Sequence, residues 1–323
     1  MILSTRRSFG LRAGALAASS LLPSGARATG DLAKTVLRVG DQTGALQSKL
    51  RIARLLDDLP YKIEWSVFSA ALNLHEALRA DAIDIGGAND SPTVSAIASG
   101  SKIAIVAAWR SRSQGVSLLV PKHSSVRSLA ELRGKTVSPT TRGSVAHFLL
   151  LGELKRAGVD PREINIAFLA PADASAAFAS GKLDAWATWG LFEARARGAL
   201  QARVLATGEG INSGLSLYSA TRAAVRDAGK LAAIADLAKR VDRGFEWTRA
   251  NRQAHIAWYA DFTRQDPALI AELYGQEAEN ARLPVDDALV ERLAHTFGVW
   301  VEAGVLGGSI DFNDYVYRSL PWG

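Results

Sequence analysis

Four segments of the chain place small polar or aromatic residues directly after an expected strand and directly before an expected helix. The candidate residues in these segments are Gln42, Thr43, Asn89, Asp90, Thr141, Arg142, Gly143, Ser144, His147, Trp189 and Gly190. The first turn of a helix carries unpaired backbone N–H groups and the positive end of the helix dipole. Each segment is therefore a candidate binding site for a small anion.

The third segment, from Thr141 to His147, offers the strongest cradle for an anion. Hydroxyl groups, a guanidinium and a glycine stand together at one helix start, and arginine binds oxyanions through several N–H groups at once. His147 lies one turn after Gly143, so the two residues share a face of the helix. Two alternatives stay open, namely that Arg142 is a solvated surface charge and that His147 is a packed imidazole.

The other segments allow similar pairs of interpretations. Gln42 and Thr43 could donate to an oxyanion, or Thr43 could simply cap the helix. Asp90 could accept a hydrogen bond from a hydroxyl or ammonium group of the ligand, or it could be a cap. Trp189 could form an apolar wall for an alkyl or aryl group, or belong to the core, which is the place expected for Trp186.

Motifs of catalysis and of metal binding are weak by comparison. The five histidines show no metal-ligand spacing, and no GxSxG, Walker A or GxGxxG motif stands between a strand and a helix. The chain has no cysteine, which excludes a disulfide framework, a cysteine-ligated metal and a thiol nucleophile. We therefore expect a binding protein without catalytic residues, cofactor or metal.

The first 28 residues have the features of an export signal. Arg6 and Arg7 precede a mildly apolar run over residues 10–22 and a small-residue end at Ala28, and this part contains no acid. The adjacent arginines indicate the twin-arginine type, with cleavage after Ala28. Without a cysteine there is no lipid attachment site, so we expect a freely diffusing periplasmic protein.

Removal of residues 1–28 takes away four arginines and lowers the formal net charge from +6 to +2. The mature chain then gives no electrostatic reason to expect nucleic acid or an anionic membrane as partner. The 295 residues that remain exceed what one hydrophobic core usually serves, so two lobes are expected.

Strands alternate with helices through the first two thirds of the chain, which predicts an α/β fold with mainly parallel sheets. Strands are expected at residues 36–39, 62–68, 82–86, 102–109, 115–121, 135–138, 164–169, 183–189, 203–207 and 215–220, and helices at 44–58, 144–158 and 172–180. Residues 223–304 contain no convincing strand and predict a helical tail, broken near Gly244, Pro267 and Pro284.

Residues 169–192, LAPADASAAFASGKLDAWATWGLF, resemble the signature LPPADARAAFEKGxVDAWxIWDPF of periplasmic aliphatic sulfonate-binding proteins, the solute receptors of ABC importers. The motifs LVPKHSSV, LRGKTV and RGSVAHFLL resemble LVPKDSPI, LKGKKV and KGSNVHYLL of the same family. The resemblance spans nearly all of the mature chain. It implies a type II periplasmic-binding-protein fold, with residues 31–118 and 213–323 in lobe I and residues 119–212 in lobe II.

The resemblance also implies a function. A sulfonate would be held in the cleft between the two lobes of a monomer by helix N-termini and hydroxyl groups, and would then be delivered to the permease subunits of an ABC importer. This chain departs from the family at three places: Gly190 stands where a carboxylate is usual, Asp90 replaces a longer acid, and Val145 replaces an asparagine. These changes make taurine a less expected ligand.

Two other interpretations remain. One is a receptor of the same fold for nitrate, bicarbonate or a nitrogenous heterocycle. The other is an enzyme on this scaffold, such as the sulfinate desulfinases or the pyrimidine-precursor synthases. The desulfinase needs a cysteine nucleophile, which this chain lacks, and an export signal argues against a cytoplasmic biosynthetic enzyme.

Overall fold

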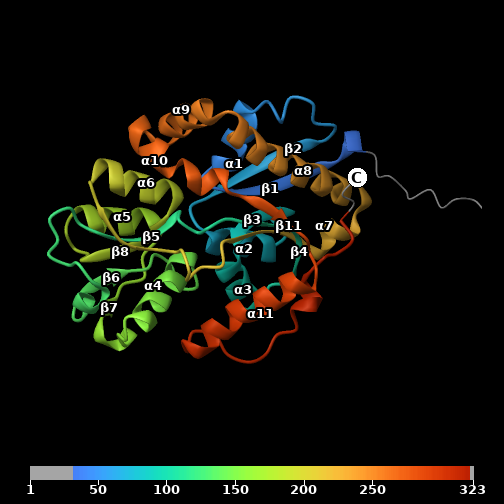
Figure 1. Cartoon of the computed structure of the whole chain (residues 1–323). Coiled ribbons are helices and arrows are strands. Elements are labelled where there is room, and N and C mark those ends of the chain that lie inside the picture. Colours follow the sequence, from blue (N-terminus) through green and yellow to red (C-terminus); the bar gives the residue numbers. More distant parts are fainter. Residues whose placement is uncertain (1–31, 321–323) are drawn as a thin grey trace, which may run out of the picture.

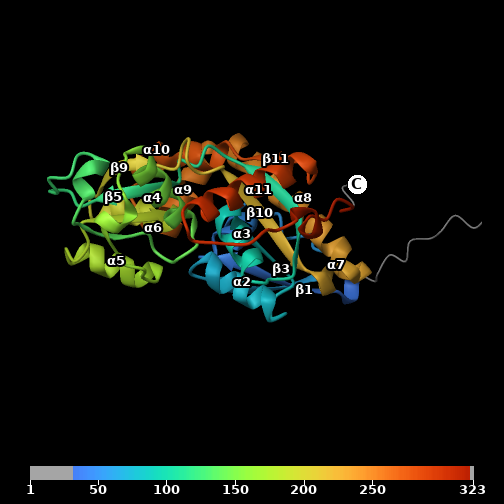
Figure 2. The same ribbon diagram turned by 90° about the horizontal axis from the view of Figure 1, so that it is seen from below.

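The computed structural model describes residues 32–320, which form two α/β lobes, each built around its own sheet (Figure 1). The predicted export signal lies outside the described residues. The lobes lie side by side in both views of the molecule (Figure 2). We call the unit around the six-stranded sheet lobe I and the unit around the five-stranded sheet lobe II. The expected two-lobed periplasmic-binding-protein fold with a helical tail is confirmed.

The strands of lobe I, in their order across the sheet, are β11 (Ala281–Leu283), β4 (Ile103–Arg110), β10 (Leu215–Thr221), β3 (Ile85–Asn89), β1 (Val36–Gln42) and β2 (Lys62–Phe68). Those of lobe II are β7 (Asn165–Ile166), β6 (Thr136–Ser138), β8 (Ala185–Trp189), β5 (Val116–Val120) and β9 (Arg203–Thr207). The predicted lobe boundary after residue 118 falls inside β5, all of which belongs to the second sheet. The exact division stays a prediction.

The helices surround these sheets. They are α1 (Ala45–Ile52), α2 (Ala71–Arg79), α3 (Asp90–Ala98), α4 (Val145–Arg156), α5 (Pro171–Ala179), α6 (Gly190–Ala199), α7 (Arg222–Arg226), α8 (Ala228–Ala250), α9 (Arg252–Thr263), α10 (Pro267–Ala278) and α11 (Asp287–Glu302). Short 3-10 segments lie at Leu32–Lys34, Leu129–Leu132, Pro161–Glu163 and Phe312–Tyr315.

The expectation of mainly parallel sheets is wrong. Within the described residues, β1 pairs in parallel with β2 and β3, and β6 with β7 and β8, whereas the other five strand pairs are antiparallel. The cause is the exchange of the chain between the lobes. Strands β5 and β10 each follow a crossover from the other lobe, and each runs antiparallel to both of its neighbours.

The tail also differs from its prediction in two places. Helix α8 continues through Gly244, which is buried against Leu50 of α1 and tolerates its helical position because tertiary packing outweighs its low propensity. The three-residue strand β11 lies inside the region expected to be purely helical, and it pairs with the edge of β4. The predicted break at Pro267 is confirmed, since Asp266 caps α10 there.

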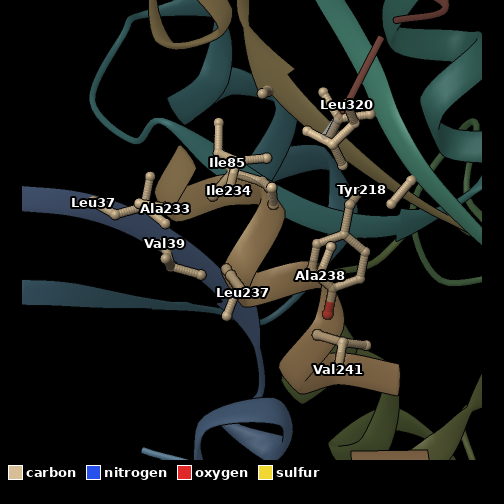
Figure 3. Packing of buried hydrophobic residues seen from close by; sticks show 14 of the residues in the cluster. Leu37, Val39, Ile85, Tyr218, Ala233, Ile234, Leu237, Ala238, Val241 and Leu320 are labelled. Atoms are coloured by element: carbon tan, nitrogen blue, oxygen red, sulfur yellow. The ribbon is translucent and has the colours of Figure 1, made fainter. Parts of the chain in front are cut away.

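The core of lobe I joins the parallel strands to the tail. Leu37 and Val39 of β1 pack against Ile234 and Leu237 of α8, and all four are fully buried (Figure 3). Burial of each such side chain contributes about 1.5–3 kcal/mol. The long helix α8 therefore holds β1 in place, and with it the loop that leaves the carboxyl end of β1.

Helices α9 and α10 do not pack on lobe I alone. Ile270 and Leu273 of α10 form a buried cluster with Ala260 of α9 and with Ala194 of α6, which belongs to lobe II. In Figure 1 these helices accordingly lie over the end of the molecule that carries α5 and α6. The tail thus bridges the two lobes in addition to the crossovers. No helix within residues 32–320 combines the length and apolar character that crossing a bilayer requires.

Candidate functional site

The carboxyl ends of the parallel strands meet between the lobes. Strands β1 and β3 end together in lobe I, and β6 and β8 end together in lobe II. A cavity of about 60 Å³, which we call the cleft cavity, lies between these ends and reaches along α2 and α3. Seven of the predicted residues line it: Gln42, Asn89, Thr141, Arg142, Gly143, Ser144 and Trp189.

The start of α4 is the part of this cavity best suited to an anion. The hydroxyl of Ser144 accepts from the N–H of His147 at 3.1 Å, which makes Ser144 the N-cap. Within the described residues, no acceptor takes the N–H groups of Val145 or Ala146. Val145 lines the cavity and Ala146 does not, so one unpaired first-turn donor and the positive end of the α4 dipole lie beside the cavity.

The hydroxyl of Ser144 itself is occupied. It donates its proton to the carbonyl of Pro139 at 3.0 Å while it caps the helix. A serine hydroxyl has one proton to give, so Ser144 cannot also donate to a ligand in this arrangement. The expectation that this hydroxyl binds the anion directly is not supported by the geometry, which assigns it to the structure of the loop.

His147 is a packed imidazole. Its side chain is 2% exposed, its Nδ1 accepts from the N–H of Gly143 at 3.2 Å, and its ring lies 5.0 Å from that of Phe168. Burial, with a smaller contribution from the nearby charge of Arg142, lowers the pKa of His147 to about 4. The imidazole is neutral at pH 7 and lies outside the lining of the cleft cavity, so it positions the loop instead of contacting the ligand.

Arg142 is exposed at the rim of the cavity. Its guanidinium carbon lies 4.4 Å above the ring of Phe168, a cation–π contact that restrains the side chain. No ion pair involves Arg142 among the residues that the structure describes. The guanidinium therefore keeps N–H donors available on the side of α4 where the first-turn donors are.

Gly143 brings the lobes into contact at this point. Its φ is +76°, which glycine adopts without strain, and a Cβ added there would lie 2.5 Å from the hydroxyl of Ser95 on α3. A larger residue would require the Ser95 side chain to move, and its Cβ would also lie 3.2 Å from the Cβ of Ser95. Glycine is therefore required here for close approach as well as for the turn.

The first predicted segment is not an open anion site. The carboxylate of Asp41 accepts from the N–H groups of Leu46 and Gln47 at 3.2 and 2.8 Å and so already caps α1. The hydroxyl of Thr43 donates to the carbonyl of Gln42, and the amide of Gln42 donates to the carbonyl of Gly87 at 2.8 Å. Gln42 still lines the cleft cavity, where its amide oxygen can accept a hydrogen bond.

Asp90 is turned away from the cleft. Its side chain is 2% exposed, and its carboxylate accepts from the hydroxyls of Ser213 and Thr296, both at 2.7 Å, and from the N–H of Ser91. Burial raises its pKa, while these hydrogen bonds oppose the rise. Asp90 is the first residue of α3 and anchors it to Ser213 and Thr296, so the structure supports neither the ligand role nor the alternative role as a cap. Asn89 beside it is the N-cap residue and does line the cavity.

Trp189 stands where the cleft cavity meets a second cavity of about 290 Å³, which we call the aromatic chamber. Gly190, Trp258 and Phe245 also line the chamber. Lys49 lies there with its ammonium 4.9 Å from the centre of the Phe245 ring. Trp186, three residues before Trp189, is fully buried, so its expected place in the core is confirmed.

Sequence reasoning missed two buried polar residues of the cleft cavity, His75 on α2 and Ser101 just after α3. His75 lies on the buried face of α2 with Ala71, Leu74 and Leu78, and a polar residue at such a position is the signal that could have identified it. Ser101 lies between α3 and β4, where no periodicity marks it. Among the described residues, no group of three or more histidine, cysteine, aspartate or glutamate side chains could hold a metal ion.

A cleft between two α/β lobes, lined by helix N-termini, defines a solute receptor. In agreement with this, the family model for the periplasmic substrate-binding protein of phosphonate ABC transporters matches residues 52–228, more than half of the chain. The chain therefore belongs to this family of periplasmic substrate-binding proteins.

Individual relatives of the chain have names that state a narrower class of ligand than the family model does. The chain is 29% identical over 285 residues to a putative aliphatic sulfonates-binding protein of Escherichia coli K12, which covers 87% of this chain and 88% of the relative. The alkanesulfonate-binding protein SsuA from Xanthomonas axonopodis pv. citri, solved bound to MOPS, is 28% identical with a TM-score of 0.79 over 89% of this chain and all of that one. The expected resemblance to sulfonate-binding receptors is confirmed.

Two other solved structures have a similar fold. The periplasmic aliphatic sulphonate binding protein SsuA from Escherichia coli is 28% identical with a TM-score of 0.71, covering 88% of this chain and 92% of that one. The desulfurization enzyme DSZB shares the fold with a TM-score of 0.59 at 13% identity. That likeness concerns the fold alone.

Proposed function

We propose that this receptor captures alkyl or aryl sulfonates in the cleft between its lobes and delivers them to the permease subunits of an ABC importer. The proposal is supported by sulfonate-binding relatives that match nearly the whole described chain. A sulfonate stays ionised at every physiological pH and offers three acceptor oxygens, so its site needs donors and no proton acceptor.

The observation that carries the proposal is the start of α4. The unpaired N–H group of Val145 and the guanidinium of Arg142 supply donors on one side of the cleft cavity, and we assign the sulfonate to them. Thr141 adds a hydroxyl donor at the same place. Trp189 would then form the apolar wall for the first carbons of the ligand.

The remaining predicted residues have supporting roles in this proposal. Gln42 and Asn89 line the side of the cavity that belongs to lobe I, and Gly143 and Ser144 shape the loop that carries the donors. His147 fixes the loop through its Nδ1. Direct contact with the ligand is therefore assigned to lobe II, and Gln42 and Asn89 bring lobe I against the same cavity, which is how a two-lobed receptor couples binding to closure.

Calorimetric titration of the ligand-free protein tests the function. The panel consists of alkane- and arylsulfonates, taurine, sulfate, nitrate, bicarbonate and methylphosphonate, with methanesulfonate as the matched partner of the phosphonate. We expect micromolar or tighter binding of sulfonates with an affinity that varies with the organic group. Heat from nitrate, bicarbonate or methylphosphonate with silence from every sulfonate would contradict the proposal and assign the cleft to another solute.

The same proposal includes no catalytic step. The enzyme on this scaffold that acts on a sulfur compound would need a nucleophilic cysteine, and the chain has none. We further propose that the protein is exported by the twin-arginine route and acts as a monomer. Replacement of Arg6 and Arg7 by lysine should abolish export of the chain, and its continued appearance in the periplasm would refute that route.

A further inference from the structure

One wall of the cleft cavity has a polar feature that sulfonate binding does not use. His75 of α2 lines the cavity and is 3% exposed, and its Nδ1 has no hydrogen-bond partner within the described residues. The hydroxyl of Ser101, 2% exposed and lining the same cavity, is also unpartnered there. An unpaired buried polar atom costs about 1–3 kcal/mol, so both atoms point to a partner that occupies the cavity.

The neighbouring threonine determines what kind of partner His75 needs. The hydroxyl of Thr93 donates its single proton to the carbonyl of Asn89 at 2.8 Å, so toward Nε2 of His75, at 3.3 Å, it can only accept. Nε2 therefore carries the proton of the ring. Nδ1 is left as a bare acceptor, and the group that fills the cavity must donate to it.

The charge state of the ring restricts the partner further. Burial lowers the pKa of His75 to about 4, so the imidazole is neutral at pH 7. Burying an ammonium group against one neutral acceptor would carry a large desolvation penalty, whereas a hydroxyl is neutral and needs only one acceptor and one donor. Glu76 and Arg79 of α2 also line the cavity, where they are exposed and form an ion pair with each other.

We propose that the cleft cavity selects hydroxylated sulfonates, with Nδ1 of His75 as the acceptor for the ligand hydroxyl. This inference rests on the proposed function, because it takes the sulfonate to be bound at the start of α4. The ligand hydroxyl donates to His75, and Ser101 supplies a second polar group in the same cavity. A ligand without the hydroxyl would leave Nδ1 unpaired or would need a trapped water there.

The test is calorimetry with matched ligand pairs that differ only in the terminal group. Ethane-, propane- and butanesulfonate are each compared with the ω-hydroxy analogue and with the ω-amino analogue of the same length. We expect one chain length at which the hydroxy analogue binds about tenfold more tightly than the alkane, and at which the amino analogue has no such advantage.

Variants then assign the preference to its residue. His75→Leu should bring the ratio between hydroxy and alkane affinities to about one, whereas His75→Asn, which keeps an acceptor oxygen near the place of Nδ1, should retain part of it. His123→Asn, at an exposed position, is the matched control and should keep the full ratio.

The outcomes separate the two proposals. Alkanesulfonates that bind with a hydroxy-to-alkane ratio near one at every length would overturn the inference and leave the proposed function intact. A preference that persists in His75→Leu would overturn the role of His75, and an amino preference would overturn the hydroxyl. Absence of binding by every sulfonate would overturn the proposed function itself.

Discussion

Two neighbouring residues of the α4 loop, Arg142 and Ser144, have different tasks although one motif suggests both. The guanidinium of Arg142 is exposed at the cavity rim and restrained by Phe168. The hydroxyl of Ser144 donates to the carbonyl of Pro139 and accepts from the N–H of His147. A change at Arg142 should therefore affect binding, and a change at Ser144 should affect stability.

Arg142→Gln should weaken every sulfonate by a similar factor, about fivefold, because an exposed guanidinium contributes about 1 kcal/mol through a charged hydrogen bond. Titration with a series of chain lengths measures this. Arg162→Gln, which removes an exposed arginine paired with Asp160, is the control and should leave the affinities unchanged. A loss limited to one chain length would show that Arg142 contacts the organic group instead of the sulfonate.

Ser144→Ala should lower the free energy of unfolding by about 1 kcal/mol, since it removes the N-cap of α4. Urea denaturation measures the loss, and Ser144→Thr, which keeps a capping hydroxyl, should recover most of it. If the affinity for sulfonates instead fell by more than the stability, the hydroxyl would have to bind the ligand, contrary to its bonds to Pro139 and His147.

At the scale of elements, the approach of α3 to the α4 loop depends on Gly143. Gly143→Ala should weaken sulfonate binding by about tenfold, because its Cβ would lie 2.5 Å from the Ser95 hydroxyl and would crowd α3 against the α4 loop. Gly181→Ala is the matched control, since Gly181 has a similar φ of +73° with nothing within 4 Å. Equal losses of affinity in the two variants would mean that backbone strain alone is responsible.

The cap of α1 predicts a pH dependence. Burial raises the pKa of Asp41 from 3.8 to about 6, against the opposing hydrogen bonds from Gln47 and Leu46. The folded state therefore holds a proton that the unfolded state has lost between these two pH values. Stability falls as the pH rises through this window, by about 2–3 kcal/mol in all, and is level above it.

Asp41→Asn isolates this contribution, because asparagine keeps a capping oxygen but does not titrate. The difference in unfolding free energy between the wild type and the variant should change by about 2–3 kcal/mol from pH 4 to pH 6. Denaturation series at several pH values measure it. Parallel curves for the two proteins would show that Asp41 does not titrate in this window.

The elements also show what a sequence can reveal and what it cannot. The ends of β2 and β9 agree with prediction because alternating polar and apolar residues mark β2 and a short run of apolar and β-branched residues marks β9. Strand β11 was not predicted, because its three residues, Ala281 to Leu283, are too few to show a periodicity and form a strand only through pairing with β4. The direction of neighbouring strands could not be predicted, because it depends on which lobe the chain enters after each crossover.

The sequence predicts which strand ends come together but not the contacts that their side chains make. Gln42, Asn89 and Thr141 lie at or just after strand ends and line one cavity, and the binding of a ligand by these residues stays a prediction. The orientation of Asp90 could not be read, because its hydroxyl partners Ser213 and Thr296 are 123 and 206 residues away in sequence. Only tertiary structure decides such a contact.

At the scale of the whole molecule, stability depends on the tail as well as on the lobes. Ile270→Ala should lower the free energy of unfolding by about 2–4 kcal/mol, because Ile270 is fully buried between α9, α10 and α6. Ile52→Ala, at a side chain that is 51% exposed, should cost well under about 1 kcal/mol and serves as control. Similar small losses in both would show that the bridge to lobe II is loosely packed.

The packing of α10 against α6 also limits how such receptors can exchange lobes by recombination. In sequence, lobe II is one continuous segment, which recombination could exchange as a single piece. In space, Ala194 of that segment packs against Ile270 and Leu273, which lie 76 and 79 residues later in the sequence. In a chimaera with a new lobe II, α6 would therefore no longer match α9 and α10, unless the α9–α10 segment is transferred together with the lobe.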